Sequence, residues 1–369
     1  MQNVSDSEIR IYRPGEEGKI VQLLAEVFGG WPKFDLSCSP LDHWRWKYLK
    51  NSFSKSLISI AMSNDKMIGC NHSITVKIKI GGKTFLGTLA GDTGVHSEFR
   101  KRGVWESMLE LTKTARRREG ISINYMTTGN PVVIRTSSKV KERHPFPLAV
   151  LSLIRIHDMD YHLKKTPIKK AHLKKVFLLL LRRKYALQRI FCPSKSLDPP
   201  FTIQNIDRFD QRVNSFWNDV KDHYFFIIAR DCDYLNWRYG DPRGGLYSIN
   251  IAETNGKLLG FIILRINHYN KEYPSGHIVD LLTLPDRLDV AEALVKGAIK
   301  FFDDHNVNTI QSLVVKNHPF EAIYRRNIFF GRKAIPFFYD EYERIEGLED
   351  LATIHPKRVY LALGDFDYI

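Results

Sequence analysis

An internal repeat limits the possible folds of this chain more than any other feature. Residues 42–69 and 233–260 align without a gap at an offset of 191 positions. Nine of the 28 aligned positions are identical, namely the pairs Asp42/Asp233, Trp46/Trp237, Tyr48/Tyr239, Ile58/Ile249, Ile60/Ile251, Ala61/Ala252, Asn64/Asn255, Lys66/Lys257 and Gly69/Gly260. A single repeated pair does not build a solenoid array, which needs at least about three units. We therefore expect a duplicated domain, and 369 residues are enough for two cores.

Each copy is predicted to contain a β-hairpin. An alternating apolar run leads into a polar turn, Asn64-Asp65-Lys66 or Asn255-Gly256-Lys257, and a second apolar run follows. In the first copy we expect a strand at 84–95, a helix from about 103 to 118 and a strand at 121–127. This order predicts an α/β fold of the α+β type, in which helices pack on a mixed sheet.

The repeat and the composition between its copies suggest four parts. We place a first domain at 1–145, a basic connecting segment at 146–197, a second domain at 198–345 and a C-terminal tail at 346–369. The tail is expected to end in an alternating strand. The aromatic, basic stretches at 44–48 and 237–239 resemble ligand-binding surfaces, but their presence in both copies favours a role in the fold.

The positive charge of the chain is local. Residues 161–197 hold eleven Lys or Arg and no acidic residue, which leaves only three of the net +14 for the rest. Such a distribution is not expected of a protein that reads nucleic acid over a broad face. Within this segment, 172–191 is predicted to form a basic amphipathic helix. That helix either contacts an anionic membrane surface or packs across the two domains with its lysines in water.

Several classes of protein are excluded by what the sequence lacks. No apolar run approaches the roughly 18 residues of a membrane span, and the N-terminus has no apolar signal core, so we expect a cytoplasmic protein. The four cysteines form no CxxC pair and no metal-ligand spacing. No metal is therefore expected.

A basic turn between a strand and a helix is the strongest functional signal. It runs from Val95 to Trp105 and contains Arg100, Lys101, Arg102 and Gly103. Unpaired amides at a helix start attract phosphate, and a glycine lets the backbone approach the anion closely. The three basic side chains add charge-assisted contacts to a diphosphate.

This turn resembles the signature of the GCN5-related N-acetyltransferase (GNAT) superfamily, and Val95, Arg100 and Gly103 match its pattern. The resemblance implies a tandem-domain acyltransferase whose turn binds the pyrophosphate of acetyl-coenzyme A (acetyl-CoA). Trp105 departs from the small residue that the family usually has. The coenzyme-binding residues implied by the resemblance are Gly94, Val95, Arg100, Lys101, Arg102, Gly103, Val104, Trp105 and Asn130.

The second copy lacks the turn. Its equivalent stretch, 284–289, is shorter, carries two acidic residues and has no glycine. Its later part, 317–330, resembles the family's closing motif through Asn317 and Tyr324, whereas the first copy keeps Asn130 and has Ser137 near the expected tyrosine. We expect one active site, in the first domain, and a degenerate second domain.

Acyl transfer from a thioester needs an acceptor amine that has lost its proton, a donor to the oxyanion and a proton for the thiolate. Asp92, on the strand before the turn, is the first candidate for general base and is equally compatible with a structural ion pair. Glu98 and His96 are second choices, and Tyr125 is a candidate proton donor to the thiolate.

The sequence thus predicts an acetyl-CoA-dependent N-acetyltransferase with a small-molecule amine as acceptor. The end of the chain, 361–369, resembles that of two-domain acetyltransferases of surface-sugar pathways, so an amino sugar comes first among acceptors. Two alternatives remain open: a tRNA-dependent aminoacyl transferase of the peptidoglycan-bridge type, and a non-catalytic acyl-CoA-binding sensor.

Overall fold

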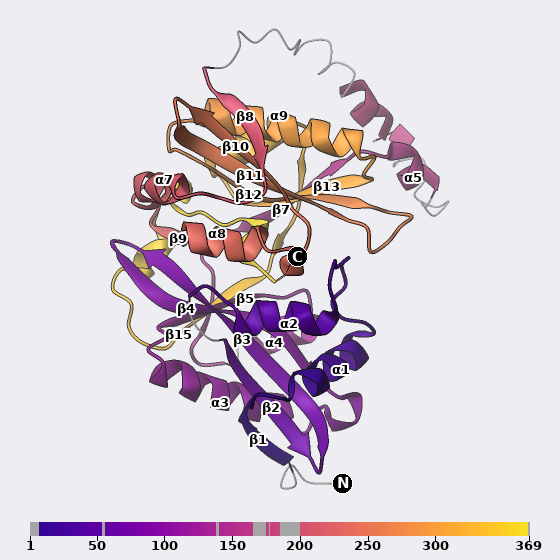
Figure 1. The fold of residues 1–369 in the computed structure, drawn as a ribbon, viewed down its shortest axis with the longest axis vertical. Coiled ribbons are helices and arrows are strands. Elements are labelled where there is room, and N and C mark those ends of the chain that lie inside the picture. The colour runs from indigo at the N-terminus through magenta and orange to yellow at the C-terminus, as the bar shows by residue number, and fades with distance from the viewer. Residues whose placement is uncertain are drawn as a thin grey trace.

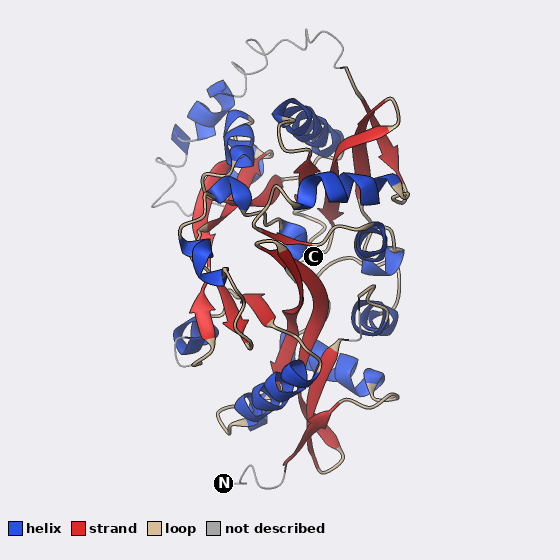
Figure 2. Ribbon diagram, turned by 90° about the vertical axis from the view of Figure 1, so that its left-hand side faces the viewer, coloured by secondary structure: helices blue, strands red, loops and turns tan. Residues whose placement is uncertain are grey.

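The computed structural model describes residues 7–53, 56–137, 140–164, 175–176, 178–184 and 200–367. Two mixed β-sheets lie one above the other along the long axis, with the C-terminal end of the chain between them (Figure 1). We call the units built on these sheets the first and second domains. From the side, helices are seen on both sides of the strands (Figure 2).

The first sheet has the strand order β1-β2-β3-β4-β5-β15-β6, with β9 paired to β3. All its neighbours are antiparallel except β4 and β5. The strands are β1 (Ser7–Ile11), β2 (Leu57–Ser63), β3 (Lys66–Ile80), β4 (Lys83–Val95), β5 (Ile123–Thr127), β6 (Arg143–Pro145), β9 (Phe226–Ile228) and β15 (Phe337–Glu341).

The second sheet repeats this plan in the order β14-β7-β13-β12-β11-β10-β8, with β12 and β13 as its parallel pair. Its strands are β7 (Val150–Ile156), β8 (Thr202–Ile206), β10 (Ser248–Thr254), β11 (Lys257–Asn267), β12 (Ser275–Thr283), β13 (Thr309–Val315) and β14 (Phe330–Ile335). The predicted hairpins are β2-β3 and β10-β11, and their turns place Asn64 and Asn255 at the same positive φ of 49°. The expected fold class is confirmed.

Helices cover both faces of the first sheet. Met108 of α3 lies against Gly69, while Val27 of α1 lies against Gly94 of the neighbouring strand. The predicted helix at 103–118 is α3, whose Val104 and Met108 are buried. Among the described residues, the α-helices with defined bounds are α1 (Glu17–Phe28), α2 (Pro40–Leu49), α3 (Val104–Arg118), α4 (Pro131–Ser137), α5 (Met159–Lys164), α7 (Arg212–Lys221), α8 (Cys232–Tyr239), α9 (Leu288–Asp304) and α10 (Pro319–Arg326).

The two domains exchange strands. β7, which precedes the second copy of the repeat, lies in the second sheet between β13 and β14. β15 returns from the other end of the chain to lie between β5 and β6 of the first sheet. The expected boundaries at 145 and 198 therefore mark the repeat in the sequence. The first sheet takes strands from before 145 and from after 198, whereas the second sheet takes β7 from between the two boundaries and its other strands from after 198.

The tail differs from the strand that was expected. Residues 358–363 form no strand with a neighbour beyond one isolated bridge, between Val359 and Phe226. Short 3-10 helices precede and follow this bridge, at Leu348–Ala352, Pro356–Arg358 and Leu363–Asp365. The alternation of apolar residues reflects burial in the core, because residues 359–366 are all buried.

The basic segment is only partly described. Residues 175–176 and 178–184 are helical, and the rest of the predicted helix at 172–191 lies outside the described residues. Leu178 and Leu181 pack against Ile156 and Ile328 of the second domain. The helical pattern of the sequence predicts Val176, Leu180 and Leu181 on one apolar face, but only Leu181 of these three is buried, while Val176 and Leu180 are 57% and 62% exposed. No helix among the described residues is long and apolar enough to cross a bilayer.

Candidate active site

The site is formed where β4 and β5 separate. These parallel strands pair only from Gly87 to Leu89, opposite Ile123 to Tyr125. Beyond this point β4 carries a bulge, because Gly91 and Asp92 both lie opposite His72 of β3. A bulge twists the strand and redirects its side chains. It turns Asp92 toward α2 and leaves one edge of β4 free of β5.

At the far end of β4 the basic turn leads into α3. Lys101 and Gly103 adopt left-handed conformations, with φ of 61° and 78°, and no side chain caps the helix. The first intrahelical bond runs from the Ser107 amide to the Gly103 carbonyl. The amides of the first turn therefore point out of the helix start, where the helix dipole favours an anion.

The side chains of this turn leave its amides open. Arg100 folds back and donates from Nε to the Val95 carbonyl at 3.0 Å, and the Arg102 guanidinium lies 5.3 Å from the Phe99 ring centroid. Lys101 is exposed. A Cβ added at Gly103 would meet no atom within 4 Å, so there is open space beside this residue. Trp105 is half-buried.

The equivalent helix of the second domain, α9, begins without a basic turn or a glycine. Asp289 lies in its first turn and pairs with Arg287 at 2.7 Å. The salt-bridge hydrogen bond to Arg287 lowers the pKa of Asp289, so this carboxylate stays charged at the helix start. Of these two helix starts, that of α3 is the more basic, because Arg100, Lys101 and Arg102 precede it.

Asn130 has a local role in the structure. Its side-chain oxygen accepts a hydrogen bond from the Val132 amide at 2.9 Å at the start of α4, and the residue is exposed. In the second domain Asn317 has a φ of 66°, and Tyr324 accepts a hydrogen bond from Ser312 at 3.0 Å. The coenzyme turn of the first domain and the Asn317–Tyr324 pair of the closing motif therefore lie in different domains, as the sequence indicated.

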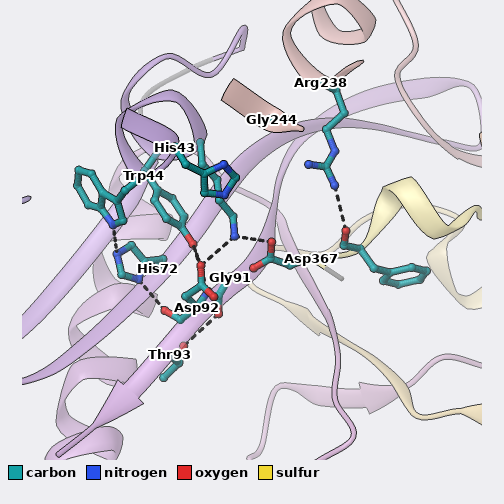
Figure 3. A network of polar contacts seen from close by, with 12 residues as sticks. His43, Trp44, His72, Gly91, Asp92, Thr93, Arg238, Gly244 and Asp367 are labelled. Atoms are coloured by element: carbon teal, nitrogen blue, oxygen red, sulfur yellow. Dashed lines mark hydrogen bonds and ion pairs between the residues drawn. The ribbon is translucent and has the colours of Figure 1, made fainter. Parts of the chain in front are cut away.

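Asp92 belongs to a network of polar contacts that sequence reasoning did not anticipate (Figure 3). Its Oδ2 accepts hydrogen bonds from Lys47 Nζ at 2.8 Å and from the Tyr48 hydroxyl at 2.6 Å. Lys47 also lies 2.6 Å from Oδ1 of Asp367 in the tail. His72 contacts the Asp92 carbonyl through Nδ1 at 2.6 Å.

The network fixes the charge of Asp92. Burial alone would raise the pKa of this carboxyl, but the charge and hydrogen bond of Lys47 outweigh burial and hold the pKa well below its usual range. For Asp367, by contrast, burial outweighs Lys47 and raises the pKa, and the Asp92 charge adds to this effect. Two carboxylates thus share one lysine, and the Arg238 guanidinium also acts on Asp367 and opposes the rise in its pKa.

The other catalytic candidates lie apart from this network. Glu98 stands in the turn with a side chain that is 72% exposed. His96 is buried and bonds Glu26 through Nε2 at 2.8 Å. Tyr125 is buried on β5, and its hydroxyl donates to the Asp365 carbonyl of the tail at 2.9 Å. Burial raises the pKa of Tyr125 well above its usual value, so the hydroxyl keeps its proton.

Lys47, Tyr48 and Asp367 are the residues that sequence reasoning missed. The first two lie in the aromatic stretch that was interpreted as part of the fold, and the repeat pairs them with Arg238 and Tyr239. That pairing was the only signal in the sequence that could have pointed to Lys47 and Tyr48. No sequence signal pointed to Asp367, because its position depends on the path of the tail. No group of potential metal ligands occurs among the residues that the structure describes.

Comparisons with known proteins agree with this geometry. Residues 8–134 match the acetyltransferase (GNAT) domain, and residues 206–328 match the acetyltransferase (GNAT) family. No curated protein matches the chain.

Solved structures share the fold at low identity. A probable N-acyltransferase from Enterococcus faecalis has a TM-score of 0.61 and 10% identity, over 91% of this chain and 72% of that one. A GCN5-related N-acetyltransferase from Anabaena variabilis has a TM-score of 0.59 and 10% identity, over 91% and 73% of the two chains. N-myristoyltransferase from Saccharomyces cerevisiae with bound myristoyl-CoA has a TM-score of 0.61 and 13% identity, over 94% and 85%.

Two mixed sheets, each with a parallel pair that separates, and one open anion-binding turn define the class of acyl-CoA-dependent transferases. The chain belongs to the GNAT superfamily, as a member with two GNAT domains in tandem. Membership in this superfamily supports acyl-CoA-dependent N-acyltransferase activity.

Proposed function

We propose that the protein is an N-acetyltransferase with a single acetyl-CoA site, in the first domain. One observation carries the proposal: the turn before α3 holds three basic residues and a left-handed glycine, whereas the start of α9 has no glycine and pairs Asp289 with Arg287. Amides of residues 103–106 would hold the pyrophosphate, with Arg102 and Lys101 beside it. The pantetheine arm would run along the free edge of β4.

The polarity at the end of β4 supports a short acyl group. A long acyl chain needs an apolar channel, because burying charged groups against hydrocarbon is costly. Here the end of the strand meets Asp92, Lys47 and Asp367, whose side chains are 15%, 6% and 18% exposed. An acetyl group fits such surroundings better than a myristoyl chain.

The same carboxylates support an amine acceptor. Asp92 and Asp367 are partly exposed and can each accept a hydrogen bond from an amine nitrogen. An acceptor that arrives as an ammonium first gives one proton to a carboxylate. Its nitrogen then attacks the thioester carbonyl, the carbon–sulfur bond breaks, and the nitrogen gives up a second proton, which the thiolate takes. Asp367 is the better proton acceptor of the pair, because its pKa is raised while that of Asp92 is lowered. An amino sugar is our first choice of acceptor.

Thiol release from acetyl-CoA with a panel of amino sugars and peptide amines tests this function. Asp92→Asn and Asp367→Asn should both lower turnover while acetyl-CoA affinity stays within about twofold of the wild type. Binding of acetyl-CoA without turnover on any amine would favour a sensor instead. Binding of tRNA in place of acetyl-CoA would favour an aminoacyl transferase.

We also propose that the basic segment contacts anionic membrane surfaces. Val176, Leu179 and Leu180 are 57%, 61% and 62% exposed, although Leu178 and Leu181 of the same stretch are buried. Arg182, Arg183 and Lys184 follow directly. Exposed apolar side chains beside basic ones suit the interface of an anionic bilayer.

A further inference from the structure

Asp92 has a counterpart in the second domain. Gly69 pairs with Val95 across β3 and β4, and its repeat partner Gly260 pairs with Thr283 across β11 and β12. Val95 and Thr283 are therefore equivalent. Asp92 and Asp280 each stand three residues earlier, so they are equivalent as well. The offset here is 188 rather than 191, which hides this match in an ungapped alignment.

One partner of each aspartate is equivalent too, whereas the cation beside it comes from a different position, because Arg230 is not the repeat partner of Lys47. Tyr48 donates to Asp92 at 2.6 Å, and its repeat partner Tyr239 donates to Asp280 at 3.2 Å. A cation then links each strand aspartate to an aspartate of the tail. In the first domain Lys47 does so, and in the second domain Arg230 lies 3.2 Å from Asp280 and 2.7 Å from Asp365.

In the second domain the tail fills the place where the parallel strands separate. β12 and β13 pair only from Ser275 to His277. Residues 359–362 of the tail line a narrow cavity together with β12 and β13, and the Tyr360 hydroxyl lies 2.6 Å from Asp280 Oδ1 and 2.6 Å from the Leu281 carbonyl. The corresponding separation of β4 and β5 is the proposed coenzyme groove. The second domain thus holds a piece of its own chain where the first would hold acetyl-CoA.

The cluster of Asp92, Lys47 and Asp367 is less buried than the cluster of Asp280, Arg230 and Asp365. The Asp280 and Asp365 side chains are at most 1% exposed, whereas those of Asp92 and Asp367 are 15% and 18% exposed. Removing one partner of a buried charge is costly, so the sealed cluster fixes the tail firmly. Asp367 lies only two residues beyond Asp365, and its position follows from that anchor. Arg238 adds a hydrogen bond to the Phe366 carbonyl at 3.2 Å.

We propose that the second domain is a dock for the C-terminal tail, and that Asp280 and Tyr360 position Asp367 against Asp92 at the acceptor end of the first domain's site. The catalytic consequence rests on the proposed function, whereas the docking does not. Asp280 and Tyr360 are positioning residues, since they act through the tail. Asp92 has the same structural role in the first domain, which explains why both copies keep this aspartate.

Tyr360→Phe tests the proposal, because it removes only the hydroxyl that contacts Asp280. The matched control is Tyr324→Phe, which removes a buried hydroxyl bonded to Ser312 in the same domain. We expect Tyr360→Phe to speed amide hydrogen exchange in residues 360–366 and to lower kcat with D-glucosamine by about tenfold, with acetyl-CoA affinity unchanged. Tyr324→Phe should change neither. Wild-type exchange and kcat in Tyr360→Phe, or equal losses in both variants, would overturn the proposal.

A second variant covers the case in which Tyr360→Phe does not fold. Asp365→Asn keeps the shape of the side chain but removes its charge beside Arg230. It should likewise speed exchange in the tail, and unchanged exchange there would contradict the docking. Hydrogen exchange needs no substrate, so it decides the docking even if the wild type does not acetylate D-glucosamine. Failure to bind acetyl-CoA would refute the proposed function alone.

Discussion

Trp46 and Trp237 stack on each other with ring centroids 5.2 Å apart, and each indole donates a hydrogen bond to the other's carbonyl. The two N–H···O distances are 3.0 Å and 3.3 Å. Because the residues are repeat partners, their contact is reciprocal, as at the axis of a two-fold dimer. The duplicated aromatic stretch is thus the joint between the domains, which agrees with its interpretation as part of the fold.

A double-mutant cycle on this pair should show coupling. Phe keeps an aromatic ring but loses the indole N–H, so Trp46→Phe and Trp237→Phe each break one of the reciprocal bonds. We expect a coupling free energy of about 0.5–1.5 kcal/mol in urea unfolding. Additive effects would mean that the pair does not hold the domains together.

Binding of acetyl-CoA should depend on the basic turn of the first domain. Lys101→Ala and Arg102→Ala should each weaken binding by about tenfold, because each removes a charge-assisted contact with phosphate. The matched control is Arg287→Ala at the start of α9, which should have no effect. Calorimetry at two salt concentrations measures this. Loss of affinity in the control variant would point to a site in the second domain.

Stability should fall in mild acid because His72 is buried in its neutral form. Burial lowers its pKa to about 4, and its Nε2 accepts a hydrogen bond from Trp44 at 3.1 Å. Between about pH 6.5 and 4 the His72 side chain binds a proton in the unfolded chain but not in the folded chain. As the pH is lowered through this range, His72 therefore reduces the free energy of unfolding by up to about 1.4 kcal/mol per pH unit.

The variant His72→Asn should flatten this pH dependence. His355→Asn is the control, since His355 is exposed and Asn can also accept the hydrogen bond from the Lys357 amide. Urea unfolding at pH 7, 6 and 5 compares the two variants. An equal pH dependence in His72→Asn and the wild type would show that His72 is not responsible.

The sequence was sufficient for features with local signals. Asn64 and Asn255 marked the hairpin turns, and Gly103 marked the start of α3. The places of β7 and β15 could not be predicted, because short strands such as Val150–Ile156 take their partners from distant parts of the chain. The ion pair that the sequence allowed for Asp92 is present, but its partners could not be predicted for the same reason: Lys47 and Asp367 approach it only once α2 and the tail have packed.

Liposome flotation tests the proposed membrane contact. Leu179 and Leu180 are exposed, so Leu179→Glu and Leu180→Glu should leave stability unchanged while they abolish flotation with phosphatidylserine vesicles. Leu246→Glu is the matched control, because Leu246 is 66% exposed but lies outside residues 146–197 in the sequence. Flotation with neutral vesicles, or none with anionic ones, would contradict the proposal.

The stoichiometry of acetyl-CoA binding tests the central claim most directly. Calorimetry on the wild type should give one site per chain, and Gly103→Val should abolish it, because valine is strained at a φ of 78° and places its side chain on the open side of the turn. Two sites per chain, or full binding by Gly103→Val, would contradict a single coenzyme site in the first domain.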